Sequence, residues 1–152
     1  MQSINRFKQT AILGVVFSIF LTAGVSTASA QDKTLYQRLG GYDGISKVVD
    51  DFLGRLTTDK MFEKFFIGQS TDSRKKIRQH VVDQFCVATG GPCIYTGREM
   101  KTSHAGLGIT EAEWNAAAKH LIGALEKAGV DEKSKNDVVA FVTTLKKDIV
   151  EK

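Results

Sequence analysis

Apolar residues recur at intervals of three and four along most of the chain beyond residue 44, which is the period of amphipathic helices. The first stripe consists of Ile45, Val48, Val49, Phe52, Leu53 and Leu56. The predicted helices span about residues 45–56, 71–88, 100–104, 110–128 and 132–150, with a short aromatic corner at residues 61–66. No segment has the pattern of a strand, and Pro92 is the single proline. The sequence therefore predicts an all-α fold.

Capping residues and glycines indicate where these helices begin and end. The start of the second helix is expected at the capping residues 71–73, and its end at Gly90-Gly91-Pro92. Thr110 and Glu113 have the spacing of a capping box at the start of the fourth helix, which Gly129 ends. The predicted buried face of the second helix comprises Ile77, Val81, Val82, Phe85 and Ala88.

Residues 1–30 have the composition of a cleavable signal peptide. Arg6 and Lys8 come first without an acidic residue, an apolar stretch follows at 11–25, and Ala28-Ser29-Ala30 supplies small residues for cleavage. The alternative is an uncleaved membrane anchor, but about 15 apolar residues fall short of the roughly 20 that span a bilayer. We therefore expect an exported protein, periplasmic or secreted, that begins at Gln31 and has no stable membrane insertion.

Size and charge narrow the classes of function. Residues 31–152 are enough for one domain with one hydrophobic core. Arg6 and Lys8 are the only charged residues before residue 31, so the formal charge of +4 falls to +2 for the remainder. The basic clusters at 74–76 and 146–147 are short and fit solvated helix faces. We therefore expect a single domain that does not bind nucleic acid.

Three histidines are candidate metal ligands. His104 ends the short third helix between Met100 and Ile109, and a neutral imidazole in such an apolar slot suits an axial haem ligand. An ordinary, partly buried histidine fits the same pattern. His80 lies on the helix expected to face His104, where it either borders the same slot or points to solvent. We interpret His120 as structural.

Cys86 and Cys93 lie seven residues apart, on either side of Gly90-Gly91-Pro92. Because the glycines let the chain fold back and an exported protein meets an oxidising compartment, the pair predicts a disulfide at the end of the second helix. A zinc site would need four ligands at zinc-finger spacings, and a redox-active pair typically has CxxC spacing. Neither pattern is present.

Several motifs occur in the order and spacing of one known family. They are Leu35-Tyr36-Gln37-Arg38-Leu39-Gly40-Gly41, Asp51-Phe52, Phe65-Phe66, Gly90-Gly91-Pro92, Tyr95-Thr96-Gly97, Met100-Lys101, His104 and Gly108-Ile109-Thr110. Through them the chain resembles the group I truncated haemoglobins from about Leu35 to Ile149. The resemblance implies a truncated globin fold over residues 31–152, a two-over-two helical sandwich around haem.

The resemblance also implies roles for individual residues. His104 matches the proximal ligand of the haem iron. The matching pocket-lining residues are Phe66, Ile77, Val81, Phe85, Met100, Ile109 and Trp114. Arg98 and Lys101 are candidate partners of the haem propionates, because a cation stabilises a nearby carboxylate. The chain lacks the CxxCH motif that attaches haem through paired thioethers, which implies haem b, iron protoporphyrin IX.

The side of the pocket opposite His104 departs from the family pattern. Many members have a tyrosine and glutamines where this chain has Leu53, Ile77 and Val81, and those side chains donate hydrogen bonds to bound dioxygen. His80, in contrast, matches a second axial histidine found in some cyanobacterial members. The usual donors are thus missing, while a possible sixth iron ligand is present.

Two haem-based functions follow, and a third is independent of haem. If His80 swings outward, the apolar pocket binds carbon monoxide and nitric oxide well and oxygen weakly. If His80 binds the iron, the protein serves electron transfer, redox or gas sensing with an unidentified electron donor, or slow nitric-oxide chemistry. The third is a non-haem helical interaction domain. We expect at most modest nitric-oxide or peroxide reactivity, and the sequence leaves the oligomeric state open.

Overall fold

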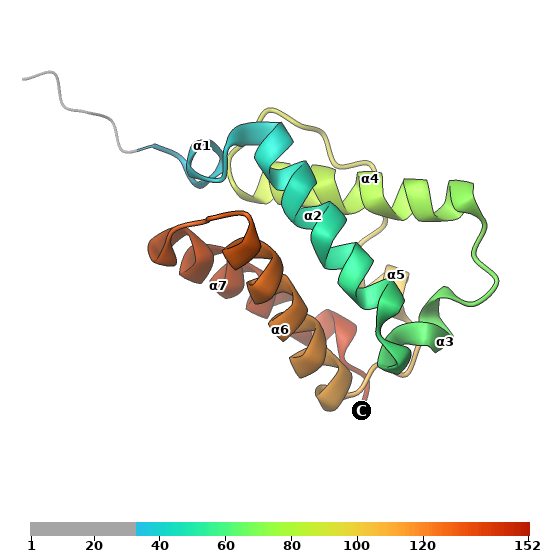
Figure 1. Cartoon of the computed structure of the whole chain (residues 1–152). Coiled ribbons are helices and arrows are strands. Elements are labelled where there is room, and N and C mark those ends of the chain that lie inside the picture. Colours follow the sequence, from blue (N-terminus) through green and yellow to red (C-terminus); the bar gives the residue numbers. More distant parts are fainter. Residues whose placement is uncertain (1–32) are drawn as a thin grey trace, which may run out of the picture. The chain divides into compact units, whose positions relative to one another are not determined.

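The computed structural model describes residues 33–152 (Figure 1). The signal peptide expected at residues 1–30 lies outside the described residues, so it stays a prediction. The helical elements are α1 Leu35–Arg38, α2 Gly41–Thr58, the 3-10 helix η1 Lys60–Phe62, α3 Glu63–Phe66, α4 Thr71–Ala88, α5 Met100–His104, α6 Glu111–Lys127 and α7 Glu132–Ile149. No strand occurs among residues 33–152, which confirms the predicted all-α class.

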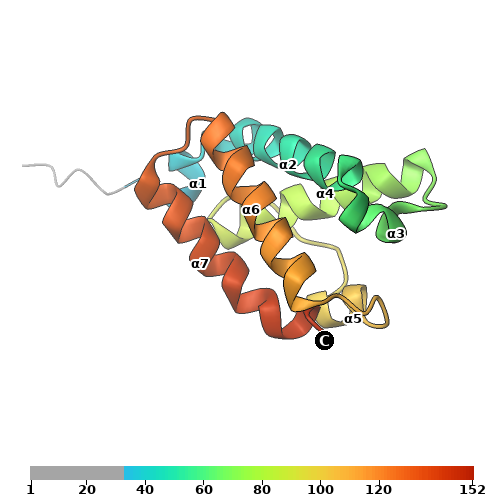
Figure 2. The ribbon, with the colours of Figure 1, turned by 60° about the horizontal axis from the view of Figure 1, so that its bottom comes forward.

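The four long helices form two antiparallel pairs. Helix α2 pairs with α4, helix α6 pairs with α7, and the two pairs pack on each other mainly through α2 and α6 (Figures 1 and 2). The short helix α5 packs against α7, close to the C-terminus (Figure 2). This is the expected two-over-two arrangement. Within the described part of the chain, no helix combines the length and apolar composition required to cross a membrane.

The core lies where the two pairs meet. Val49 of α2, Val82 of α4, Leu125 of α6 and Val138 of α7 are buried almost completely and belong to one apolar cluster. Each long helix therefore contributes its apolar stripe to a common interior, and burial of these side chains supplies the main driving force for folding.

The start of the domain differs from the sequence prediction. Helix α1 was not predicted, and α2 begins at Gly41 rather than near Ile45. The capping box between Thr34 and Gln37 starts α1, but the helix has only four residues, too few to show a period. Gly40, with a φ of 82°, turns the chain directly into α2.

Helix α4 confirms most of the predicted face and corrects two details. Its N-terminal cap is Ser70, whose side chain accepts a hydrogen bond from the Ser73 amide, one residue before the expected start. Val82 and Phe85 are buried as predicted, but Ala88 is exposed. The inner position at this end is taken by Thr89, whose hydroxyl donates to the Phe85 carbonyl at 2.7 Å. At the end of α4 the buried position is therefore Thr89, one residue after the predicted Ala88.

Candidate functional site

His104 is the last residue of α5 and is half-buried. Its Nδ1 lies 2.8 Å from the carbonyl oxygen of Met100, one turn earlier in the same helix. A carbonyl oxygen only accepts hydrogen bonds, so the neutral ring must carry its proton on Nδ1. The lone pair of Nε2 is then free for a metal ion, and the bond to Met100 fixes the plane of the ring.

The loop after His104 is tied to the end of the chain. The Glu151 carboxylate accepts hydrogen bonds from the amides of Gly106 and Gly108, at 2.6 Å each. These two bonds are the main reason that the pKa of Glu151 lies below its ordinary value. Glu151 has no signal in the sequence, because no local motif links it to a loop more than 40 residues away.

His80 lies on α4 and is half-buried. Its Nδ1 is buried and has no hydrogen-bond partner among the described residues. The ring meets Tyr95 edge-on, with ring centroids 6.1 Å apart and planes at 77°. Tyr95 is held in turn, since its hydroxyl donates to the Arg98 carbonyl at 2.7 Å, and burial raises the pKa of this phenol. Tyr95 therefore joins the histidine of α4 to the segment that leads into α5.

A cavity of about 290 Å³ lies between the second half of α2 and the first half of α4. Leu53, Phe66 and Ile77 supply apolar lining, so three of the predicted pocket residues are brought together here. Gln69 lines the same cavity and was missed by the sequence analysis. Its amide nitrogen donates to the Phe65 carbonyl at 2.8 Å, while its Oε1 is buried without a partner among the described residues.

The other predicted pocket residues differ in burial. Val81, Met100, Ile109 and Trp114 are half-buried. Phe85 lies in the main core and packs edge-on against Phe141 of α7, with ring centroids 5.9 Å apart.

The two predicted propionate partners are exposed: Arg98 lies two residues before α5, and Lys101 lies in its first turn. Neither forms an ion pair with a residue in the described part of the chain. Their charged groups are therefore available to bind an anionic group of a ligand.

His120 has a different environment from the other two histidines. Its Nε2 lies 2.8 Å from a carboxylate oxygen of Asp59, and its ring packs edge-on against Phe62. Asp59 also caps η1 by accepting from the Met61 amide, and the bond from His120 is the largest cause that lowers the pKa of Asp59. These contacts join α6 to the end of α2, which agrees with a structural role.

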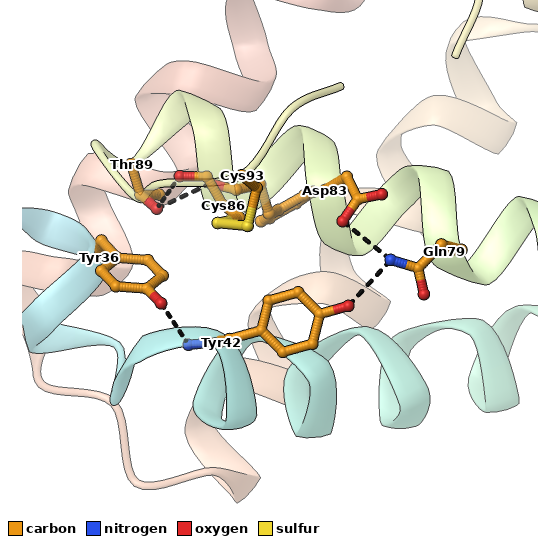
Figure 3. The surroundings of a disulfide bond; sticks show 8 residues. Tyr36, Tyr42, Gln79, Asp83, Cys86, Thr89 and Cys93 are labelled. Carbon is orange, nitrogen blue, oxygen red and sulfur yellow. Dashed lines mark hydrogen bonds between the residues drawn. A yellow bond between two sulfur atoms is a disulfide. The ribbon is translucent and has the colours of Figure 1, made fainter. Parts of the chain in front are cut away.

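A disulfide joins Cys86, fully buried in the last turn of α4, to Cys93 beyond the glycine turn, as the sequence predicted (Figure 3). Their Cα atoms lie 5.9 Å apart, within the usual range for a disulfide. Gly91 lies between this bond and the ring of Tyr36, where a Cβ would be 2.5 Å from the ring. The disulfide therefore joins the last turn of α4 to Cys93, which lies two residues before Tyr95.

The donor set fits a haem group. His104 offers one unprotonated nitrogen, Nε2, and the half-buried apolar residues Met100 and Ile109 lie on either side of it in the chain. Among residues 33–152, no group of three or more histidine, cysteine, aspartate or glutamate side chains could hold a metal ion on its own. One imidazole is the protein ligand that an iron already held by four porphyrin nitrogens requires.

Comparison with known proteins gives the family. The sequence profile of the bacterial-like globins matches residues 34–151. A group 1 truncated haemoglobin of Nostoc is 36% identical over 119 residues, covering 78% of this chain and 98% of the relative. Another, from Mycolicibacterium paratuberculosis, is 32% identical over 120 residues, covering 79% of this chain and 86% of the relative. The chain belongs to the group 1 truncated haemoglobins.

Solved structures of truncated haemoglobins have the same fold. The 2/2 haemoglobin of a Synechococcus strain, in the cyanomet state and with covalently attached haem, superposes with a TM-score of 0.70 and 26% identity. The Fe(III) form of the Tetrahymena pyriformis protein superposes with a TM-score of 0.71 and 25% identity. Each comparison covers 79% of this chain and all of the other. Membership in the truncated haemoglobins supports a haem-binding globin.

Proposed function

We propose that this truncated haemoglobin binds haem b through Nε2 of His104 and takes up diatomic gases reversibly at the iron. The observation that carries the proposal is the 2.8 Å contact from Nδ1 of His104 to the Met100 carbonyl. A hydrogen bond at Nδ1 selects the tautomer that can bind a metal and raises the basicity of Nε2. The haem iron supplies the site for oxygen, nitric oxide or carbon monoxide.

The remaining residues support the same proposal. Leu53 and Ile77 give the cavity between α2 and α4 an apolar lining, and neither they nor Val81 can donate a side-chain hydrogen bond to a ligand. Arg98 and Lys101 are exposed and offer two cations to the propionates. Family membership favours this function over the non-haem interaction domain that the sequence alone left open.

His80 is the candidate sixth ligand, and its surroundings make it a weak one. If Nε2 of His80 binds iron, the proton must sit on Nδ1, which is buried without a partner among the described residues. An unpaired buried donor costs about 1–3 kcal/mol, whereas His104 meets no such cost. We infer that His80 binds the iron reversibly and yields to a gas ligand, which favours gas binding over permanent bis-histidyl electron transfer.

The decisive experiment compares three proteins by absorption spectroscopy, with pyridine haemochrome to identify the haem. The wild type and the control His120→Ala are expected to show a Soret band and haem b at about one equivalent. His104→Ala is expected to lose most of its haem, because the haem iron would then have no protein ligand on that side. A wild-type protein without a Soret band after haem addition, or unchanged haem content in His104→Ala, contradicts the proposal.

We further propose that the protein is exported and that residues 1–30 are removed. The support is the composition of this segment, together with a disulfide that is typical of oxidising compartments. N-terminal sequencing of the protein from the periplasm or the medium is expected to begin at Gln31. A full-length product confined to the cytoplasm contradicts export.

A further inference from the structure

The C-terminus pairs with the connection between α5 and α6 through a set of backbone hydrogen bonds. The amide of Glu151 donates to the Ile109 carbonyl at 2.9 Å, and the amide of Glu111 donates to the Lys152 carbonyl at 3.0 Å. Residues 151 and 152 thus run alongside residues 109–111 and are bonded to them through the backbone. The segment immediately after His104 is held between this pairing and the end of α5.

The Glu151 side chain adds two charge-assisted bonds to the same loop. Its two carboxylate oxygens each accept one amide, from Gly106 and from Gly108, at 2.6 Å. Both glycines have positive φ angles, 79° and 61°, which other residues rarely adopt. The backbone therefore turns alternate amides toward one point, where they form a small anion-binding nest. Glu151 occupies that nest.

The connection from Glu151 to His104 is short. The Leu107 amide donates to the His104 carbonyl at 3.1 Å, and the Ala105 amide donates to the Lys101 carbonyl at 3.0 Å. The four amides of residues 105–108 therefore each have a partner, either in α5 or in Glu151. Helix α5 has only five residues and no side-chain cap at its start. A helix this short does not hold its own conformation, so its orientation depends on contacts from outside.

We propose that Glu151 is a positioning residue for the iron ligand: its carboxylate fixes the loop after α5 and thereby the direction of the His104 ring. This inference rests on the proposed function of His104. The carboxylate touches neither iron nor gas, and acts through Gly106 and Gly108. Without the two bonds from Gly106 and Gly108 to Glu151, α5 can rotate or fray. The bond between His104 and the iron is then weaker, although the imidazole itself is still present.

The test compares Glu151→Ala and Glu151→Gln with Glu132→Gln in the full-length, haem-loaded protein. Glu132→Gln is a matched control because it also removes one carboxylate, here an exposed one that pairs with Lys135 on α7. Three quantities are measured: hydrogen exchange of residues 100–110 by mass spectrometry, the rate of haem transfer to apomyoglobin, and the iron–histidine stretching band in the ferrous Raman spectrum. The band is recorded with His80→Ala added to every protein, so that the ferrous iron is five-coordinate.

In Glu151→Ala we expect faster exchange in residues 100–110, at least tenfold faster haem loss and a shifted or broadened iron–histidine band. Glu151→Gln should lie between this variant and the wild type, because its amide oxygen still accepts one bond. Glu132→Gln should match the wild type. The stretching band separates positioning from a merely structural role, since a general loss of stability does not move it.

Two results overturn the inference, and they are distinguishable. If hydrogen exchange of residues 100–110 is faster in Glu151→Ala but the Raman band and the rate of haem loss are those of the wild type, the Glu151 carboxylate orders the loop without positioning His104. If the wild type holds no haem, or holds it equally well after His104→Ala, the proposed function itself fails and the inference falls with it.

Discussion

At the scale of single residues, the two candidate ligands differ in the partner of Nδ1. His104 has the Met100 carbonyl, whereas His80 has no partner among the described residues. We therefore predict that His80→Ala keeps its haem. Because the variant has no competing imidazole, its ferrous form should bind carbon monoxide at least tenfold faster than the wild type in stopped-flow measurements, with a high-spin spectrum beforehand.

His120→Ala is the control for this experiment, since the contacts of His120 with Asp59 and Phe62 involve none of the predicted pocket residues. It should leave the association rate unchanged. Equal rates for His80→Ala and the wild type, with high-spin ferrous spectra in both, would show that His80 does not bind the iron.

Gly91 provides a second prediction at this scale. A Cβ there would lie 2.5 Å from the Tyr36 ring and 2.6 Å from the Cys86 sulfur. Since the disulfide fixes the Cys86 sulfur and the half-buried Tyr36 ring packs against the core, Gly91→Ala should destabilise the fold by about 1–3 kcal/mol, the usual cost of overpacking. Urea unfolding measures this change.

Gly54→Ala is the matched control, because nothing lies within 4 Å of its Cβ position inside α2. It should instead raise stability by about 0.5–1 kcal/mol, as alanine favours helix over glycine. A loss of stability in both variants would indicate that the Gly91 result has a cause other than crowding.

At the scale of elements, the disulfide connects α4 to the segment that carries Tyr95. Closing a loop of about eight residues contributes roughly 2.5 kcal/mol on the chain-entropy model. We predict that the double variant Cys86→Ala and Cys93→Ala loses about this free energy of unfolding in urea. It should also show broader His80 resonances, because Tyr95 packs on that ring from two residues beyond Cys93. Unchanged stability would mean that the glycine turn alone fixes this end of α4.

The elements also show what sequence patterns can and cannot predict. The start of α6 was predicted correctly, because the capping box of Thr110 and Glu113 is a local signal that the structure reproduces. Helix α1 was missed because four residues cannot show a period. The start of α2 was missed because Tyr42 and Asp43 in its first turn are exposed and polar enough to hide the stripe.

The same difference between local and distant contacts decides which residues of the candidate site can be predicted from the sequence. His104 could be identified because its helix, the neighbouring glycines and the family motifs are adjacent in sequence. Glu151 and Gln69 could not, because their roles depend on contacts made only after folding. Glu113 is a mixed case: its capping role was predicted, but its 2.6 Å ion pair with Lys64 of α3 was not.

At the scale of the whole molecule, many carboxylates are held charged by partners from other elements. The bond from Lys64 is the first cause that lowers the pKa of Glu113 below its ordinary 4.5, and the bond from Arg38 does the same for Asp137, whose ordinary value is 3.8. Asp50, paired with Arg78, is also lowered. These ion pairs join α3 to α6, α1 to α7 and α2 to α4.

A lowered pKa in the folded state means that the unfolded chain binds protons first as the pH falls. These carboxylates therefore contribute stability that is complete above about pH 5 and is lost as the pH drops through their folded pKa values. We predict a thermal midpoint that is constant between pH 6 and 7 and falls steeply below pH 4, measured by circular dichroism.

The variant Glu113→Gln should lower the midpoint at pH 7 and reduce the difference between the midpoints at pH 7 and pH 3. The control Glu132→Gln should preserve that difference. An equal difference in Glu113→Gln and the wild type would show that the Lys64–Glu113 pair does not contribute to acid sensitivity, and that the loss of stability arises at the other ion pairs between helices.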